Sequence, residues 1–461
     1  MGISLLLDIS RQSFRALDAA MNVASQNVAN AETEGYHRRR LGLNAIEMSP
    51  RGILGSGQTG PSAGGVGIGS YERLRDSMMD HARWEARGGL NYASEQERVM
   101  STVESLFPSG DGSLSHSIEN FWNGWADLSD HPTDNGVRLA LLGRAESMAA
   151  RMHTLDNGLD RMQTETKLAL GDRVDEANLL IDRVASLNVS IAHARRSGNP
   201  DMGSEDAVGL ALERLSELVP ARFEAQDDGS TSVYIGGMRV VQLAQSIPLN
   251  LDTSGANPSL TIGDTGIGFP SGTDGGVIGA LLGPSLAGIE EARDQLNLLA
   301  ESIVTEVNAV HSAGYGSDGG TGRNFFDTTG LSAGTIAVSS DVADSPTAVA
   351  AGSSGTATGD NSVALDIHDI RFAQVLAGGT QTASDYAVDI ATGVGASVAA
   401  ARARAVGSES TVAGLDALAK GVSSVSIDDE MVSLIQLQQA YAASARLLKI
   451  ADDMFMSLLS I

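Results

Sequence analysis

The two ends of this chain carry the same pattern, and that pattern limits how the whole molecule can fold. Mostly apolar residues recur alternately three and four positions apart, which is the spacing of a heptad seam on an α-helix. The N-terminal series is Leu7, Ser10, Phe14, Leu17, Met21, Ala24 and Val28, and the C-terminal series is Leu434, Leu437, Tyr441, Ser444, Leu448, Ala451, Phe455 and Leu458. We therefore predict a helix at each end, with a narrow stripe that must be covered.

Local signals place the ends of these two helices. The first helix should end near Asn30, with Gly35 as a stop signal a few residues beyond. The second should begin at Ser426, because Ser426 followed by Asp429 is an acidic variant of the capping box. The acidic residues that follow Ser426 also suit the positive end of a helix dipole.

Neither predicted helix has a partner in its own local sequence. Because most helix stability in proteins comes from packing an apolar face, we expect the two terminal helices to pack on each other, on copies of themselves, or both. The alternative is an ordinary helical hairpin that closes one globular domain. The residues that we predict to form an assembly seam are Leu7, Phe14, Leu17, Met21, Val28, Leu434, Leu437, Tyr441, Leu448, Phe455 and Leu458.

The middle of the chain divides by composition, and its length of 461 residues is enough for about three domains. Apolar stripes predict long helices, and two stripes between 148 and 194 are offset as in a coiled coil with a skip. Short β-type runs stand between 221 and 279. We predict a mainly α fold with inserted β structure, in a nested arrangement. Its parts are terminal coiled-coil segments (1–40 and 421–461), a discontinuous helical domain (41–220, 280–320 and 363–420), a small antiparallel β domain (221–279) and a short Gly/Ser/Ala/Thr-rich insertion (321–362).

Composition excludes several classes of function. Lys and Arg number 31 against 57 Asp and Glu, a net charge of −26, which disfavours binding to nucleic-acid phosphates. The chain has no cysteine, so disulfides and thiolate chemistry are excluded. The sequence contains no run of about 18 consecutive apolar residues, so we expect no membrane-spanning helix. The first residues lack the basic segment of a signal peptide, so we expect any export to leave this end uncleaved.

The sequence offers few residues for catalysis or metal binding. Gly60–Gly64 matches the G-x-S-x-G pattern around Ser62, but it lacks the strand and helix that a nucleophile elbow needs. It lies in the glycine-rich stretch 52–69, which we predict to be a loop or a loose hairpin. The eight histidines show no i, i+4 pair. His37–Arg40 is the one basic run, and it either meets an acidic partner surface or is simply solvated. We predict no catalytic, cofactor or metal site.

Two motifs at opposite ends of the chain resemble those of the bacterial flagellar axial proteins, the rod, hook and hook-associated family. Residues 27–36 read NVANAETEGY, similar to the family signature N-x-A-N-x-x-T-x-G-Y. The matching positions are Asn27, Ala29, Asn30, Thr33, Gly35 and Tyr36. Residues 438–459 resemble the C-terminal end of the same proteins. The basic run after Tyr36, residues 67–75 and Phe325-Phe326 look like the hook-associated branch.

That resemblance implies a structural role without enzymatic activity. It implies a subunit that polymerises into the junction between hook and filament and adapts one to the other. The implied partners are copies of itself in a ring, the hook protein, the second junction protein, an export chaperone on the C-terminal segment and the flagellar type III export apparatus, with no nucleic acid, no membrane insertion and no cofactor. The implied location is the extracellular flagellum. The alternatives are another axial protein, the hook protein, or an exported enzyme with flagellar-type ends. Residues 312–362 are short for the outer domain that larger members insert there.

Overall fold

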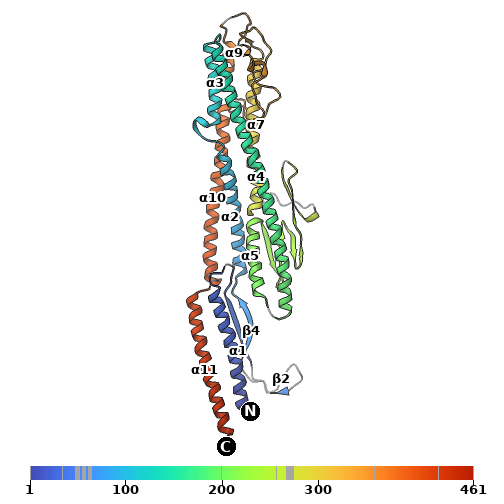
Figure 1. Cartoon of the computed structure of the whole chain (residues 1–461), viewed down its shortest axis with the longest axis vertical. Helices are drawn as coiled ribbons and strands as arrows, with labels where there is room; N and C mark the ends of the chain where they lie inside the picture. Colours follow the sequence, from blue (N-terminus) through green and yellow to red (C-terminus); the bar gives the residue numbers. More distant parts are fainter. Residues whose placement is uncertain are drawn as a thin grey trace.

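The structure is a computed structural model that describes residues 2–33, 35–46, 52–53, 59–60, 65–198, 200–255, 257–265, 275–357, 359–423 and 425–459. The described part is an elongated rod made mainly of helices, with both ends of the chain at its base (Figure 1). The predicted fold class, mainly helical with a small inserted antiparallel sheet, is confirmed.

The helices in chain order are α1 (Gly2–Ala29), α2 (Ser77–Glu104), α3 (Leu114–Asp130), α4 (Asn135–Arg196), α5 (Met202–Leu218), α6 (Gly276–Ala280), α7 (Leu286–His311), α8 (Ser340–Ala343), α9 (Ser362–Asp369), α10 (Ala383–Ser423) and α11 (Ile427–Leu459). The strands are β1 (Arg39–Ile46), β2 (Gly52–Ile53), β3 (Thr59–Gly60), β4 (Gly65–Arg73), β5 (Ala221–Ala225), β6 (Thr231–Ile235), β7 (Met238–Gln242), β8 (Gln245–Ser246), β9 (Leu249–Asp252), β10 (Ser259–Ile262), β11 (Tyr315–Gly316) and β12 (Ala350–Gly352).

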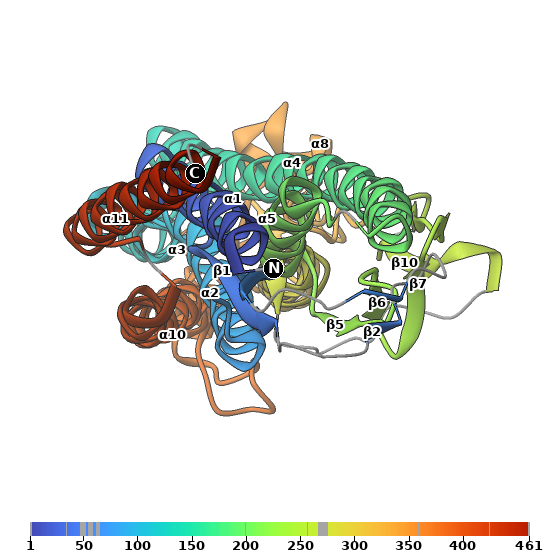
Figure 2. The same ribbon diagram turned by 90° about the horizontal axis from the view of Figure 1, so that it is seen from below.

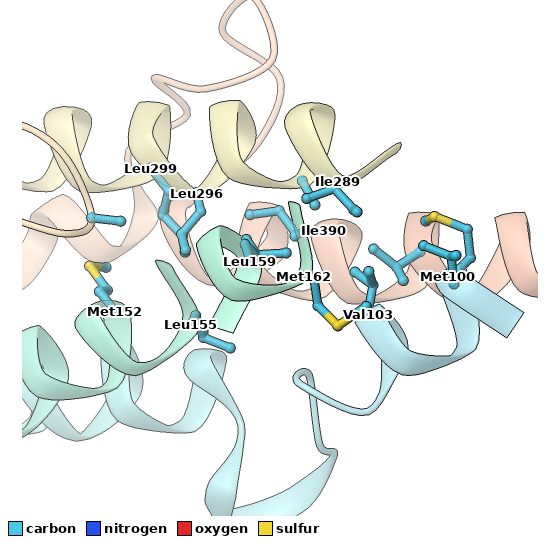
Figure 3. Close-up of a cluster of buried hydrophobic side chains, with 14 of the residues drawn as sticks. Met100, Val103, Met152, Leu155, Leu159, Met162, Ile289, Leu296, Leu299 and Ile390 are labelled. Atoms are coloured by element: carbon cyan, nitrogen blue, oxygen red, sulfur yellow. The ribbon is translucent and has the colours of Figure 1, made fainter. Parts of the chain in front are cut away.

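Helices α2, α4, α5, α7 and α10 form the body of the rod. Their apolar faces interdigitate in one continuous core (Figure 3), where side chains from four helices meet. Met162 of α4 lies beside Val103 of α2, with Ile289 of α7 and Ile390 of α10 in the same cluster. Such burial of apolar area is the main force that holds separate helices together.

Helix α4 is a single helix of 62 residues that runs along most of the rod (Figure 1). Its buried stripe keeps alternating steps of three and four as far as Met162, and then takes three successive steps of four through Thr166 and Leu170 to Val174. This stutter rotates the stripe and realigns it with the helix axis. The offset expected between the two stripes therefore lies within one unbroken helix.

The inserted β structure is a four-stranded antiparallel sheet, in the order β5-β6-β7-β8, followed by the β9–β10 hairpin. Two asparagines of α4 attach this β structure to the body. The side-chain amide of each one forms the pair of hydrogen bonds that a neighbouring strand's backbone would otherwise form. Asn178 exchanges two hydrogen bonds with the backbone of Leu249, and Asn188 does the same with Thr231. Both amide groups are thereby satisfied, as buried polar groups require.

The far end of the rod, the tip, consists of α3, α9 and residues 312–357 and 359–361 (Figure 1). The Gly/Ser/Ala/Thr-rich segment is packed into this tip, and Phe325, Phe326 and Ile336 are fully buried there. Asn308 of α7 holds the two phenylalanines, since its side chain accepts from both of their backbone N–H groups and donates to the carbonyl of Phe326. The predicted insertion thus completes the end of the helical bundle in this structure.

A β-hairpin involves the glycine-rich region 52–69, which the sequence predicts to be a loop or a loose hairpin, and its first strand lies before that region. Strands β1 and β4 pair antiparallel, with Leu43 opposite Ile68. The hairpin lies alongside α1 at the base of the rod (Figure 1). Its alternation is weak in the sequence because glycine occupies every second position from Gly65 to Gly69, so its strands depend on packing against α1.

Candidate functional site: the terminal helix pair

Helices α1 and α11, the terminal pair, lie side by side at the base of the rod (Figures 1 and 2). The ring of Phe14 meets the ring of Tyr441 edge-on, with ring centroids 4.8 Å apart. Both residues belong to the predicted seams. The sequence left open whether the terminal helices pack on each other, on copies of themselves, or both. The structure shows that the two helices of one chain pack on each other.

The face of α11 that α1 covers follows the predicted stripe. The positions of α11 that are not exposed include Leu434, Leu437, Ser444 and Ala451, and Ala451 is 2% exposed. Tyr441 and Leu448 on the same stripe keep 41% and 38% of their surface. The side chains of Phe455 and Leu458 lie outside the described residues. Ser426 caps the helix as predicted, because its Oγ accepts a hydrogen bond from Asp429 N at 3.3 Å.

The seam of α1 is only half covered. Leu7 is 38% exposed, and Phe14, Leu17, Met21 and Val28 are half-buried. Ser10 and Ala24 of the predicted series are buried, and so are Ala16, Val23 and Asn27, which lie outside that series at intervals of seven and four. That face packs against β1 and β4, so α1 is covered on two sides. Ala16 is small and Asn27 is polar, so with Val23 alone these positions give too weak a hydrophobic signal for sequence reasoning to identify this face.

The remaining surface of α11 is exposed, and it carries several large apolar side chains among polar and charged ones. Leu447, Ile450 and Met454 project away from the covered stripe, with 59%, 55% and 49% of their surface exposed. No charged residue occurs between Met431 and Ala445. A surface helix usually turns its apolar residues toward the core, so apolar side chains exposed on the opposite side are typical of an interaction surface. In this chain on its own, nothing described covers most of α11.

The motif residues between 27 and 36 form the turn that leads α1 into β1. Asn27 is 1% exposed, donates to the carbonyl of Arg39 at 2.9 Å and accepts from Arg39 N at 3.0 Å. Its Oδ1 also accepts from Tyr36 Oη at 2.8 Å. Asn30 donates to the carbonyl of Gln26 and accepts from Thr33 Oγ1. Gly35 has φ of +76°, a left-handed conformation that favours glycine.

The remaining motif position, Ala29, is the last residue of α1 and is exposed. The motif residues therefore serve local structure, with Asn27 as the central hydrogen-bonding group. Burial raises the pKa of Tyr36 above its usual value, in keeping with a hydroxyl that stays protonated and donates to Asn27.

The basic run pairs with acidic side chains of the same chain. Arg38 Nε lies 2.7 Å from Glu430 Oε1 on α11, and Arg39 Nη2 lies 2.8 Å from Asp206 Oδ2 on α5. Asp206 also faces Arg73 and His37. Burial by itself would raise the pKa of Asp206, but its hydrogen bonds and the neighbouring positive charges outweigh burial and lower that pKa.

No cluster of metal-ligating side chains occurs in the described ranges. Among those same residues, none of the helices has the length and hydropathy of a membrane span. Ser62, the centre of the G-x-S-x-G match, lies outside the described residues. The terminal pair is thus a helical surface suited to interaction, with a buried polar turn at the end of α1 that leads into β1.

Two family models match the chain. The first, described as the flagellar hook-associated protein FlgK helical domain, covers residues 100–326. The second, described as the flagellar basal body rod FlgEFG protein C-terminal, covers residues 422–461. The second match therefore corresponds to α11 and the few residues that precede it.

Curated relatives point the same way. The chain is 26% identical to flagellar hook-associated protein 1 of Bacillus subtilis, over 97% of this chain and 96% of that protein. It is 24% identical to flagellar hook-associated protein 1 of Escherichia coli over 70% of this chain, and the match spans 60% of the Escherichia coli protein. The fold is similar to the flagellar hook junction protein FlgK from Burkholderia pseudomallei, with a TM-score of 0.63, 13% identity, 74% of this chain and 99% of that chain covered.

Proposed function

The chain belongs to the flagellar hook-associated protein 1 family, and we propose from this premise that it polymerises through the α1–α11 pair. Proteins of this family are structural components of the flagellum at the hook–filament junction rather than enzymes. The chain is accordingly a structural subunit that assembles with other axial proteins of the flagellum.

One observation carries the polymerisation proposal: α11 is uncharged from Met431 to Ala445 and is covered by α1 on a single face. Exposed apolar surface of this extent is unfavourable in water and marks an interaction site. Neighbouring copies placed around an axis would cover the outer face of each α11, including Leu447, Ile450 and Met454. The α1–α11 stripe would then hold each subunit together, and the outer face of α11 would hold subunits to one another.

A ring of subunits at a junction has two ends, and each end needs a partner. We propose that the hook protein binds one end and the second junction protein binds the other. Before assembly, the exposed face of α11 needs protection, and an export chaperone that binds residues 421–461 would provide it by taking the amphipathic helix into a groove. Export through the flagellar type III apparatus would deliver the chain to the extracellular flagellum.

The experiment introduces a charge on the outer face of α11 in the bacterium that carries this protein. Leu447→Asp should allow export but prevent junction assembly, so cells should carry hooks without filaments in electron micrographs. The matched control is Leu179→Asp, because Leu179 is 70% exposed on α4 of the body. Normal filaments in the Leu447→Asp strain would contradict the proposal.

Deletion of the whole protein separates this function from that of the hook protein. Cells without the protein should keep their hooks and lose their filaments. Loss of the hooks themselves would favour a role as the hook subunit.

A further inference from the structure

The lower part of α10 lies along α2 with little apolar burial (Figure 1). Above it, a stripe of α10 that runs from Ala387 to Ala405 is buried in the body. Residues 406–418 all belong to the described part of α10, and none of them is buried. Among their apolar side chains, only Val412 and Leu415 are half-buried. Apolar packing therefore holds this part of the helix weakly.

An open groove lies between α2 and α10 at the lower end of the buried stripe. Its volume is about 680 Å³, and its lining includes Gly89 and Ala93 of α2 and Gly407 and Ser408 of α10. Such a gap lacks the van der Waals contacts that close packing would supply. The segment of α10 below the groove therefore needs another kind of contact to stay on α2.

Two arginines of α2 supply that contact. Arg83 and Arg87 are four positions apart, so both lie on the same face of the helix. Asp416 of α10 accepts from both of them, because Arg83 Nε donates to its Oδ1 at 2.7 Å and Arg87 Nη2 donates to its Oδ2 at 3.2 Å. The three side chains keep between 19% and 28% of their surface. They are thus partly shielded from solvent, which strengthens their attraction relative to a fully exposed pair.

The same two arginines also face α5. Arg87 Nη1 lies 2.7 Å from Glu213 Oε1 and 3.7 Å from Glu217 Oε1, and Arg83 Nη2 lies 3.9 Å from Glu213 Oε1. Burial by itself would raise the pKa of Asp416, but the hydrogen bonds and charges of Arg83 and Arg87 outweigh burial and lower that pKa. The carboxylates of α5 therefore orient the two guanidinium groups, and Asp416 meets donors that are already in place.

We propose that Arg83, Arg87 and Asp416 form an electrostatic latch that decides whether residues 406–423 of α10 stay on the body. When the latch is closed, this segment is a helix that lies on α2. When the latch opens, the segment leaves α2 and loses helix, because its three glycines lower its intrinsic helix stability. The opened segment extends the C-terminal region that an export chaperone can bind, a consequence that rests on the proposed function. The latch itself is a property of the body in the isolated chain.

Hydrogen exchange on the isolated full chain tests the latch. Asp416→Asn keeps the size of the side chain and removes its charge. Backbone amides of residues 408–420 should then exchange about tenfold faster or more, whereas amides of α4 should not change. Asp416→Glu keeps the charge and should retain most of the protection. Sodium chloride at about 1 M, which reduces the range of charge interactions to about 3 Å, should speed exchange of the same amides much more in the unchanged protein than in Asp416→Asn.

The matched control is Glu97→Gln, which removes an ion pair of 2.7 Å between Glu97 of α2 and Arg402 of α10. This pair joins the same two helices beside the buried stripe, so its loss should leave exchange of residues 408–420 unchanged. Unaltered exchange in Asp416→Asn, or an equal effect of Glu97→Gln, would overturn the proposal. If Asp416→Asn unfolds the body, the unchanged protein decides, because exchange that does not respond to salt would also overturn it. The polymerisation test with Leu447→Asp is read in cells and does not depend on any of these results.

Discussion

Phe14 of α1 and Tyr441 of α11 place their rings edge-on at 4.8 Å between centroids, although they lie at opposite ends of the chain. An aromatic pair in this geometry contributes roughly 0.5–1.5 kcal/mol beyond the area that it buries. It is the clearest side-chain contact within the terminal pair, because most other residues of α11 are exposed. The stability of the pair should therefore depend strongly on this contact.

Tyr441→Ala should loosen the terminal pair, at a cost of about 1–3 kcal/mol to the local opening free energy, through loss of ring contact and buried area. Hydrogen exchange should show faster exchange of backbone amides in residues 10–28 and 430–450, with no change in α4. Leu447→Ala is the control, because Leu447 is 59% exposed on the other face of α11. Equal effects of the two substitutions would contradict the assignment of faces.

Asn27→Ala should destabilise the turn between α1 and β1. The buried amide makes three hydrogen bonds, and its removal leaves Arg39 N and the Arg39 carbonyl without their partner. The expected cost is about 1–3 kcal/mol. Asn30→Ala, which removes two more exposed hydrogen bonds, should cost clearly less. Amide exchange in residues 36–46 measures the difference, and a reversed order would exclude Asn27 as the central group.

Two adjacent glycines of α2 should respond to alanine in opposite directions. A Cβ on Gly88 would lie 2.7 Å from the carbonyl oxygen of Ser216, so Gly88→Ala must push α5 away, at a cost of about 1–3 kcal/mol. A Cβ on Gly89 meets only Ser408 Oγ at 3.9 Å, so Gly89→Ala should stabilise the helix by about 0.5–1 kcal/mol. Denaturant unfolding of both variants gives the two signs, and destabilisation by Gly89→Ala would contradict this prediction.

Stability should depend on pH through His311 at the tip. His311 is 1% exposed, its Nδ1 lies 2.8 Å from the carbonyl oxygen of Arg323, and its Nε2 accepts from Ala350 N. Burial lowers the pKa of His311 to about 4, against an ordinary value of about 6.5. Between these two values the unfolded chain binds the proton and the folded chain does not. The stabilisation is thus complete above about pH 6.5 and falls by about 3 kcal/mol as the pH drops to about 4.

The measurement is the free energy of unfolding at several pH values, compared between the unchanged protein and His311→Gln. The difference between the two proteins should shrink as the pH falls from 7 to 4.5, because only the unchanged protein has the buried imidazole. Other titrating groups cancel in this comparison. A difference that is independent of pH would show that His311 is not held neutral.

The terminal helices were predictable from the sequence, because apolar residues at steps of three and four over many turns indicate an α-helix with one apolar face. The cap at Ser426 and the end of α1 were local signals as well. The β1–β4 hairpin was predictable only as one of two alternatives for residues 52–69, a loop or a loose hairpin. Its first strand and its register were not predictable, since glycines at alternate positions remove the hydrophobic alternation and the strands pack against α1. The buried face of α1 was missed for a similar reason, because Ala16 and Asn27 do not look like core residues.

The partners of the basic run were also beyond sequence reasoning. Arg39 and Arg38 pair with residues 167 and 392 positions away, and no local pattern identifies such partners. The sequence could say only that His37–Arg40 meets acidic groups or solvent. The fold decides between these by bringing Asp206 and Glu430 to the end of α1.

The unbroken length of α4 has a mechanical consequence. With 62 residues it spans about 90 Å, from the tip at Asn135 to Arg196, which adjoins the start of α5 where Asp206 lies. Such a stiff lever has no joint at which a rotation could be absorbed. A tilt of only about 5° at its lower end would swing the far end by about 8 Å over that length. A small change in the ion pairs around Asp206 would therefore move the tip by a large distance. In the opposite direction, a force on the tip would be transmitted along α4 to the base of the rod.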